Sequence, residues 1–444
     1  MKSGIFNLLF AVVMILSFSL IPAVPAGAAS KPLPTTIYAD VTFVGGGQDG
    51  SLIKPFDTIQ AAVDHAIDGD IIRVAAGTYF ESVRISTDDV TVRGEAGAIL
   101  DGTGVIGSTG GFDLFLVDGV TIEGFDIRNH SGSLFGGGAG IMLNQANNNH
   151  IKGNTVSDTD DGIILWFTAS NNIVEDNVVS GSSTSIWVIH ASHHNTIRNN
   201  TTSDSFGGGI KLSGHGNFGA PSDNIVRHNT ISTNAGHGIT VSGVPSCKPR
   251  GCSLGGGNVV ESNDISGGMS DGIALFGNNN IAERNTISGG ARAIHISGSD
   301  NVVKWNKFDG SGLRGVHLQG NGNVFKFNDI AAGRISGIFV FFNEDNVVAW
   351  NTIDGAGTGI LVQGTTNDRA PNDNVVKWNT VTDSGQYGIR LIGVATGAPS
   401  RNLIKNNTVS GSGIDDLSHG GFSTPNTWTD NTCGTKSGAD IPAC

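Results

Sequence analysis

The feature that most constrains the fold is an internal repeat of about 22 residues. Each copy contains a G-I-x-L motif, a polar turn, a second apolar segment, an Asn and a short segment like N-T-I-S. The first apolar residue of the motif recurs as Ile141, Ile163, Ile186, Ile210, Ile239, Ile273, Ile294, Val316, Ile338, Ile360 and Ile389. The Asn recurs in step as Asn154, Asn177, Asn200, Asn229, Asn263, Asn285, Asn306, Asn328, Asn351, Asn379 and Asn407. A fixed period of this size is typical of solenoids, whose units bury their apolar faces only by stacking, so we predict one continuous array.

The spacing of apolar residues within each copy indicates strands. Apolar and polar residues alternate over short stretches, and Gly, Asn, Ser and Asp interrupt the chain every few residues. Asn tolerates the left-handed backbone conformation of a sharp corner, and its amide can bond to the same side chain one coil away. We therefore expect the recurring Asn to occupy such corners and to form a structural ladder.

This pattern resembles the right-handed parallel β-helix with its pectin-lyase-like repeat. That superfamily includes polysaccharide lyases, some glycosidases, uronate epimerases and the NosD-like periplasmic proteins. The resemblance covers roughly residues 50 to 432 and implies an all-β, right-handed parallel β-helix solenoid. It does not by itself imply one activity, because one fold hosts many chemistries.

The two ends of the chain have a different composition. Residues 1–28 contain Lys2, an apolar run and Ala26-Gly27-Ala28, which predicts a cleaved secretory signal peptide, with a lone anchoring helix as the alternative. Within an N-terminal cap and entry segment, 29–85, helical spacing from Phe56 to Ala66 predicts a short helix over the end of the solenoid, with Asp57 or Thr58 as its N-cap and Gly69 as its stop. The string TIQAAVDHAIDGDIIRVAAGTY resembles the entry segment of NosD-like proteins and several β-helix lyases and epimerases. We assign 86–414 to the coils and 415–444 to a C-terminal cap.

The cysteines and the net charge indicate where the protein is located and which partners it can bind. The four cysteines fall in two close pairs, Cys247 with Cys252 and Cys433 with Cys444, and in an exported chain this favours two local disulfides over a zinc site. The net charge of −13 argues against a nucleic-acid partner but not against an acidic polysaccharide met by a local basic stripe. We expect a secreted or extracellular protein, or a periplasmic one if the source has an outer membrane, with no membrane insertion after signal cleavage and a monomeric state.

Strand alternation predicts which residues face outward. If both apolar residues of G-I-x-L point into the core, the residue between them points out, and so does the residue two places before the Ile. The first position reads Met142, Ile164, Trp187, Lys211, Thr240, Ala274, His295, His317, Phe339, Leu361 and Arg390. The second reads Asp161, Thr184, Gly208, His237, Asp271, Arg292, Arg314, Ser336, Thr358 and Tyr387. We interpret this face as a groove, walled on one side by four insertions that follow the motif near 214–223, 243–257, 364–373 and 393–400.

The residue types on this face suit an acidic sugar polymer. Trp187, Phe339 and Tyr387 offer rings for stacking on sugars, and Arg390 offers a cation for carboxylates. The candidate catalytic residues are Lys211, His237, Arg292, His295, Arg314 and His317. The resemblance to β-helix lyases implies an Arg or Lys base with calcium or a second cationic group as neutraliser. Lys211 is the candidate base, yet it lies three coils from Arg292, roughly 14 Å along the stack. Two candidate centres therefore remain, one at Lys211 and a tighter one formed by Arg292, His295, Arg314 and His317.

Three further motifs bear on function. Asp158, Asp160 and Asp161 in SDTDDG are turn formers or a calcium site, and calcium is the candidate cofactor. The strings DTDDG and Gly236-His237-Gly238 faintly resemble polygalacturonase-type glycosidases, although the further Asp pair and the Arg-Ile-Lys motif of that family are absent. The group His190, His193 and His194 invites comparison with NosD-like proteins, which act around copper, but a polar corner is the interpretation we favour.

A last ladder precedes the recurring Asn and reads Arg284, Trp305, Phe327, Trp350 and Trp378. Such aromatic residues either stack to stabilise the solenoid or, if they face outward, offer a second sugar platform. Taken together, the sequence predicts an exported protein that acts on a uronate-containing polysaccharide, with β-elimination as the expected reaction. The alternatives are a non-catalytic NosD-like or cell-surface carbohydrate-binding protein and a polygalacturonase-like hydrolase.

Overall fold

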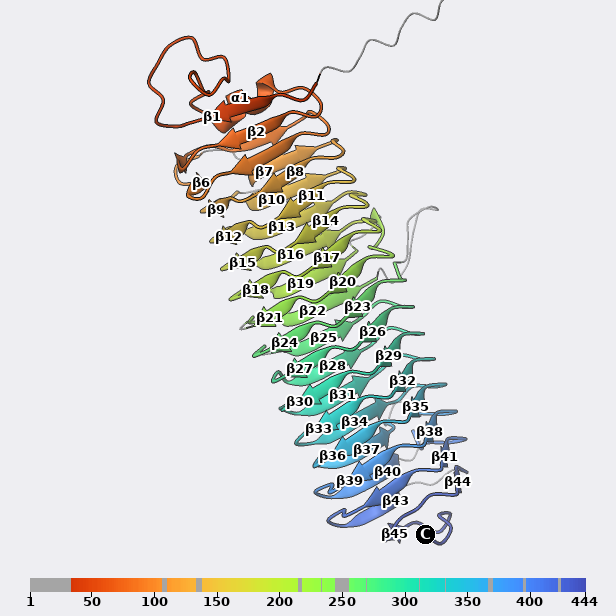
Figure 1. The fold of residues 1–444 in the computed structure, drawn as a ribbon. Helices are drawn as coiled ribbons and strands as arrows, with labels where there is room; N and C mark the ends of the chain where they lie inside the picture. The colour runs from red at the N-terminus through yellow and green to blue at the C-terminus, as the bar shows by residue number, and fades with distance from the viewer. Residues whose placement is uncertain are drawn as a thin grey trace, which may run out of the picture. The chain divides into compact units, whose positions relative to one another are not determined.

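Each copy of the repeat folds into three short strands that join three different sheets. A computed structural model describes residues 33–444 except 106–109, 133–137, 215–217, 233, 244–254, 269, 311, 332, 366–369, 394–396 and 422–424. Within it, Pro34–Cys444 forms one compact unit. Strands from successive coils lie side by side and pair in parallel (Figure 1). The predicted all-β, right-handed parallel β-helix with an N-terminal helix is confirmed.

The three sheets are numbered here by decreasing number of strands. Sheet 1 has 16 strands, from β1 (Thr36–Ala39) to β44 (Thr427–Thr429), and sheet 3 has 14, from β3 (Gly77–Tyr79) to β42 (Thr408–Ser410). Sheet 2 has 15 strands and contains the G-I-x-L motifs. Its strands are β4 (Val83–Ile85), β7 (Gly110–Phe115), β10 (Ala139–Asn144), β13 (Asp161–Trp166), β16 (Thr184–Ile189), β19 (Gly208–Ser213), β22 (His237–Ser242), β25 (Asp271–Leu275), β28 (Arg292–Ile296), β31 (Arg314–Leu318), β34 (Ser336–Phe341), β37 (Thr358–Gln363), β40 (Tyr387–Gly393), β43 (Asp415–Gly421) and β45 (Lys436–Ser437).

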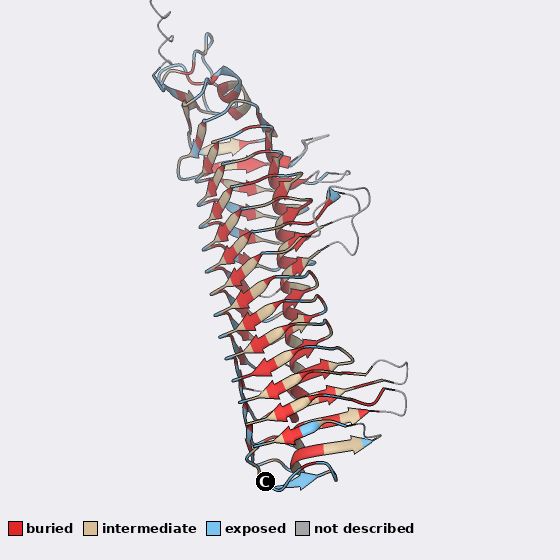
Figure 2. Cartoon of the chain, turned by 90° about the vertical axis from the view of Figure 1, so that its right-hand side faces the viewer, coloured by how far each residue is buried: buried red, intermediate tan, exposed pale blue. Residues whose placement is uncertain are grey.

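The core is the space enclosed by the three sheets, and it is filled by the apolar residues of the repeat. Both apolar residues of G-I-x-L point inward, as Ile294 and Ile296 of β28 illustrate, and both are fully buried. The central residue of each three-residue strand, such as Val303, is buried in the same core. Buried segments therefore recur on every coil along the inner side of the stack (Figure 2).

Two Asn ladders hold successive coils together. The predicted ladder is confirmed: Asn306 donates from both its backbone N and its Nδ2 to Oδ1 of Asn328, at 2.9 and 3.0 Å. A second ladder at the start of the sheet 1 strands was not predicted, and it runs through Asn149, Asn172, Asn195, Asn224, Asn258, Asn280, Asn301, Asn323, Asn346, Asn374, Asn402 and Asn426. The ladder amides also bond to backbone carbonyls, which satisfies polar groups that the coil corners bury.

The expectation that the ladder Asn adopts the left-handed conformation was wrong. The residue immediately before it does so instead, with φ of 55° at Arg284, 57° at Trp305 and 53° at Trp350. The Asn itself turns inward and is buried, because its amide has to reach the next coil. The left-handed corner is thus occupied by whatever side chain precedes the Asn, and that side chain points away from the ladder.

The N-terminal end of the solenoid is covered by α1 (Ile59–His65), which contacts β1, β2 (Ile71–Val74) and β4. Thr58 is the N-cap, and its hydroxyl accepts a hydrogen bond from the N–H of Ala61 at 3.2 Å, as one of the two predicted caps required. The helix ends at His65, earlier than the predicted stop at Gly69, which lies in the following turn with φ of 89°.

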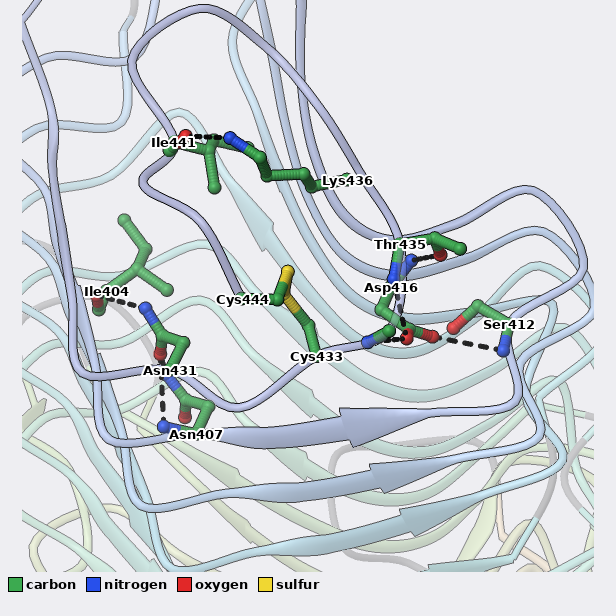
Figure 3. Close-up of a disulfide and its surroundings, with 11 residues drawn as sticks. Ile404, Asn407, Ser412, Asp416, Asn431, Cys433, Thr435, Lys436, Ile441 and Cys444 are labelled. Atoms are coloured by element: carbon green, nitrogen blue, oxygen red, sulfur yellow. Dashed lines mark hydrogen bonds between the residues drawn. A yellow bond between two sulfur atoms is a disulfide. The ribbon is translucent and has the colours of Figure 1, made fainter.

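At the C-terminal end, the sheets continue past residue 414 into the segment predicted as a cap. There β43, with the sequence DDLSHGG, pairs with β40 in sheet 2. The predicted disulfide between Cys433 and Cys444 is present, with Cα atoms 4.9 Å apart (Figure 3). Asp416 ties the same region together by accepting hydrogen bonds from backbone N–H groups of Ser412 and Gly434.

Some sequence-based predictions fall outside the described residues. These are the signal peptide at 1–28 and the Cys247–Cys252 pair, and they stay predictions. Across the part of the chain that the structure describes, we find no helix of the length and hydrophobicity needed to cross a bilayer.

Candidate functional site

The outward face of sheet 2 carries the two predicted ladders in register. The pairing of β28 with β31 places Arg292 opposite Arg314 and His295 opposite His317, and the next pairing continues to Ser336 and Phe339. Some of the residues that face outward on sheet 2 are nevertheless buried. Met142, Ile164, Phe339 and His317 are buried although they point away from the main core.

Near the N-terminal end of this face, outward-facing side chains are buried because they pack against one another. Ala139, Met142, Ile164 and Ile189 form a second apolar cluster outside the core, against which Trp166 and Trp187 pack. Trp187 donates its indole N–H to the hydroxyl of Ser213 at 2.8 Å. The Trp187 ring, which was predicted to stack on sugars, is therefore half-buried and held by its hydrogen bond to Ser213.

Asp271 is the centre of the site, and the sequence analysis listed it in a ladder without giving it a role. It begins β25 and is fully buried. Arg292, from the next coil, makes two contacts with its carboxylate, one from Nε to Oδ1 and one from Nη2 to Oδ2 at 3.1 Å. His237 from the preceding coil and His295 each place Nδ1 3.3 Å from Oδ2. One carboxylate thus brings together three predicted catalytic residues from three strands.

The charge state of Asp271 follows from these contacts. Burial by itself would raise the pKa of this carboxyl, but hydrogen bonds with His237, His295 and Arg292, together with the charge of Arg292, hold the pKa well below its usual range. Asp271 is therefore an ionised acceptor at neutral pH, and it can orient the two imidazoles that contact it.

His317 lies beside this group and is uncharged. Its ring stacks on that of His295, with centroids 5.0 Å apart and planes 9° apart, and on its other side it meets Phe339. Nη1 of Arg292 lies 3.2 Å from its Nδ1, and because a guanidinium only donates, Nδ1 is the acceptor. Burial, followed by the electrostatic influence of the neighbouring His295, Arg314 and Arg292 side chains, lowers the pKa of His317 to about 3. The proton of the neutral ring therefore sits on Nε2, a buried atom with no partner among the described residues.

Arg314 differs from Arg292 in having no acidic partner among the described residues. Its guanidinium carbon lies 4.5 Å from the ring centroid of Phe339, and its Nε is buried without a hydrogen bond in the described residues. Burial and the charge of Arg292 lower the pKa of Arg314, as expected for a cation that lacks a counter-ion. Ser336 follows it in the same register, also with an unpartnered buried hydroxyl among the described residues. Arg314 therefore presents a positive charge that an incoming anion would satisfy.

Apolar rings wall this centre. Phe276 packs edge-on against His237 and His295, with centroid distances of 5.8 and 5.2 Å. Phe341 lies 6.0 Å from His317 on the opposite side. Such walls lower the local dielectric and strengthen the electrostatic interactions between them.

The second predicted centre, around Lys211, is separate. Lys211 lies on β19, and β22 and β25 separate it from Arg292 on β28, as the sequence spacing predicted. Its ammonium lies 4.7 Å from the ring centroid of Trp187. Asp161, two coils away, has its pKa raised, chiefly by burial and further by Asp160, while Lys211 acts in the opposite direction. This second group holds an acid and a base but lacks a second cation.

Two other predicted residues lie farther along the same face. The guanidinium of Arg390 stacks on the ring of Tyr387, 4.0 Å from its centroid. Arg390 makes no ion pair within the described residues, and its Nε is buried without a partner there. Phe339 is covered by Arg314 and by Phe341, so its ring is not open to a ligand.

The residues predicted to bind calcium are engaged in backbone contacts. Asp160 accepts a hydrogen bond from the N–H of Gly132 at 2.8 Å, and Asp161 accepts one from the N–H of Thr184 at 3.2 Å. No cluster of three or more His, Cys, Asp or Glu suited to a metal ion occurs in the described ranges. Of the three histidines compared with NosD-like proteins, His190 accepts from the indole of Trp166, whereas His193 and His194 contact each other. The calcium site stays a prediction.

Two family models match parts of the chain. One, described as periplasmic copper-binding protein (NosD), matches residues 63–248, and one described as right handed beta helix region matches residues 271–433. No curated protein matches the chain.

Among solved structures, the chain is similar to an alginate lyase from Paenibacillus sp. str. FPU-7, with 18% identity over 64% of this chain and 99% of that chain, at a TM-score of 0.48. It is also similar to a mannuronan C-5 epimerase A-module from Azotobacter vinelandii, with 16% identity, coverage of 91% and 96%, and a TM-score of 0.44. A mutant tailspike protein of E. coli bacteriophage HK620 in complex with a pentasaccharide has 10% identity over 70% of this chain and 64% of that chain, at a TM-score of 0.51. At such identities the likeness concerns the fold alone, which is a right-handed parallel β-helix of the pectin-lyase-like type.

Proposed function

We propose that the protein is an exported lyase that cleaves a uronate-containing polysaccharide by β-elimination at the Asp271 centre. The observation that carries this proposal is the convergence of His237, Arg292 and His295 on one buried carboxylate, beside a cation, Arg314, for which the described part of the chain holds no acidic partner. In this reaction a base removes the C5 proton of the uronate. The electrons of that C–H bond form the C4–C5 double bond while the C4–O bond breaks, and the departing oxygen takes up a proton.

His295 is the proposed base. Its Nδ1 contacts the ionised carboxylate of Asp271, which fixes the ring and stabilises the imidazolium formed when Nε2 takes a proton. Its Nε2 lies 3.3 Å from Oε1 of Gln319, and rotation of that side chain frees the nitrogen for the substrate. Stacking on His317 restricts the plane of the ring.

Arg314 is the proposed partner for the uronate carboxylate. The acidity of the C5 proton depends on neutralising that carboxylate, and a guanidinium can do so with two parallel hydrogen bonds. Arg292 is already paired with Asp271, so Arg314 is the cation that remains available. A partly buried cation such as Arg314 gains more from such pairing than an exposed one, because water competes less for it.

His237 is the proposed donor to the departing oxygen. Its side chain is 26% exposed, and its Nε2 has no partner among the described residues. It shares Oδ2 of Asp271 with His295, so donor and base lie on either side of one carboxylate. The backbone N–H of Asp271 donates to Nδ1 of His237 at 3.3 Å, which places the ring proton on Nε2, from where His237 can donate it to the departing oxygen.

Uncompensated cations along the face support an acidic polymer as substrate. Lys211, Arg314 and Arg390 make no ion pair in the described part of the chain, although the protein as a whole carries a charge of −13. They extend along sheet 2 from β19 to β40, which is seven coil steps or roughly 34 Å. A protein of this fold binds a pentasaccharide, which is consistent with a sugar chain as the ligand. The Cys433–Cys444 disulfide supports export.

A non-catalytic carbohydrate-binding protein is the second candidate. The NosD model matches 63–248, and His317, a candidate catalytic residue, is only 7% exposed. In this case the same cations would bind the polymer without turnover.

The test is a set of single variants assayed for formation of unsaturated uronates by ultraviolet absorbance. His295→Ala and Arg314→Ala should each lower kcat/KM by at least about a hundredfold, because each removes a group acting on the reacting sugar. His228→Ala is the matched control, since His228 is an exposed histidine on a corner away from sheet 2. If both site variants cleave like the control, the site assignment fails; if all variants bind the polymer and none cleaves it, the binding protein is favoured.

A further inference from the structure

A second surface with its own chemistry lies at the corner between sheets 1 and 3. Four successive coils place an aromatic residue in the left-handed position before the ladder Asn, namely Trp305, Phe327, Trp350 and Trp378. These side chains are 45%, 40%, 41% and 37% exposed. We name this row the aromatic corner. It is carried by corners that lead from sheet 1 to sheet 3, whereas the Asp271 centre lies on sheet 2.

The choice of residue at this corner is unfavourable for the backbone. Left-handed φ is tolerated best by Asn and Asp, and those residue types occupy the equivalent position in other coils, as at Asp176, Asn199, Asn406 and Asp430. A bulky ring at φ of 53–57° costs energy there, and exposing it costs more. A continuous exposed apolar row of this kind usually marks an interaction site.

The rings stack on one another along the solenoid. Centroids are 6.0 Å apart between Trp305 and Phe327, 5.1 Å between Phe327 and Trp350, and 4.5 Å between Trp350 and Trp378, with planes within 18° of parallel. Their faces are thus occupied by neighbouring rings, and the edges are what a ligand can reach. Bases of single-stranded nucleic acid bind by stacking on open ring faces, so this row is poorly suited to them.

Hydrogen-bond donors without partners line the row. No indole N–H of Trp305, Trp350 or Trp378 bonds to another described residue, whereas Trp166 and Trp187 on sheet 2 both donate theirs. Lys377 lies over the rings of Trp378 and Trp350, and Lys405 over that of Trp378, at 4.5 to 5.8 Å.

The lysines of the aromatic corner also lack acidic partners. In earlier coils, the equivalent basic residues pair with a glutamate, as Lys152 does with Glu123, Arg198 with Glu175 and Lys304 with Glu283. From Lys326 onward, Lys326, Lys377 and Lys405 make no ion pair within the described residues. From Lys326 onward the row therefore offers unpaired cations and N–H donors on an acidic protein, whereas at its Trp305 end Lys304 lies over the ring and pairs with Glu283.

We propose that the aromatic corner is a second, non-catalytic binding site for a linear acidic polysaccharide. The carboxylates of such a polymer would meet Lys326, Lys377 and Lys405, while its hydroxyl oxygens accept from the indole N–H groups. Aligned donors repeat at the coil spacing, over three steps or roughly 14 Å from Trp305 to Trp378. This binding does not require cleavage at sheet 2, so the site can hold polymer whether or not the Asp271 centre acts on it.

The test uses the double variants Trp350→Asn/Trp378→Asn and Lys377→Gln/Lys405→Gln in the mature protein that also carries His295→Ala. Asn is the residue found at the same corner in other coils, so the first variant should fold, and a thermal unfolding midpoint at or above that of the parent confirms it. Binding is measured by affinity electrophoresis in gels that contain polygalacturonate, alginate or neutral dextran. Arg198→Gln is the matched control, because Arg198 has the same place in an earlier coil but pairs with Glu175.

Each double variant should weaken binding to at least one acidic polymer roughly tenfold, with the control unchanged and no retardation by dextran. Unchanged binding in both variants would show that the aromatic corner does not hold the polymer, and would overturn the proposal. Equal loss on dextran, or retention of single-stranded DNA or anionic vesicles in place of the acidic polymers, would overturn the proposed ligand. Because the background lacks His295, these results do not depend on whether the protein is a lyase.

Discussion

Replacing His317 by Asn should remove a specific dependence of stability on pH. The folded protein holds this imidazole neutral with a pKa of about 3, whereas an unfolded chain gives histidine a pKa near 6.5. On acidification from pH 7.5 to pH 5, the unfolded chain takes up a proton at this position and the folded protein does not. The unfolded state is therefore favoured, and stability is lost as pH falls through this window.

The magnitude follows from the window. About 1.5 pH units separate 6.5 from 5, and each unit corresponds to about 1.36 kcal/mol, so His317 should contribute a loss of about 2 kcal/mol. Asp271 does not interfere, because its lowered pKa affects stability only when pH falls below about 4, where an unfolded Asp begins to protonate. Asn keeps an acceptor oxygen for Nη1 of Arg292 but does not titrate.

The assay is urea denaturation at pH 7.5 and pH 5 of the wild type, His317→Asn and His228→Asn, an exposed histidine that serves as the control. The wild type and the control should lose about 2 kcal/mol more between the two pH values than His317→Asn does. Equal losses in all three proteins would refute the reasoning that burial keeps His317 neutral.

Three further predictions concern the rest of the molecule. Asn306→Ala should lower the free energy of unfolding by about 3 kcal/mol, because it leaves buried donors of Asn285 and the carbonyl of Ala282 unpaired, and a loss below about 1 kcal/mol in urea denaturation would contradict this. Reduction of Cys433–Cys444, which closes a short loop of sequence separation 11, should destabilise the C-terminal coil by about 2–3 kcal/mol, with hydrogen exchange rising in 427–441 and not in β28; exchange rising along the whole solenoid would count against it. For the calcium proposal, titration of chelator-treated protein should give heat that Asp160→Asn abolishes, and no heat in either protein would remove calcium from consideration.

Several features of the fold and of the candidate site could be predicted from the sequence alone. The period and the alternation were sufficient to place Ile294 and Ile296 in the core and His295 outside it, because a strand has only two faces. The register of Arg292 with Arg314 and of His295 with His317 followed from counting, since one coil maps on the next with the G-I-x-L motif aligned. The same counting separated Lys211 from Arg292 correctly.

The errors have a different origin. Asp271 was overlooked because its importance lies in which side chains turn toward it, and rotamers are not encoded in the spacing. Phe339 was expected to be open to a ligand, yet Arg314 covers its ring. Met142 was expected to face outward and does so, but an apolar cluster on the same face buries it. The second Asn ladder at Asn149 was missed because its Asn adjoins polar turns in which Asn is common, so that it carried no distinct signal.

Mass spectrometry of the released oligosaccharides distinguishes elimination at the Asp271 centre from hydrolysis. The purified mature protein would be incubated with pectate, alginate and glycosaminoglycans, and the products compared with acid hydrolysates of the same polymers. The account predicts products from one of these polymers that are each lighter by one water than the corresponding hydrolytic oligosaccharide and that absorb in the ultraviolet, and it predicts none from His295→Ala. Products of full hydrolytic mass, or intact polymer throughout the panel, would contradict it.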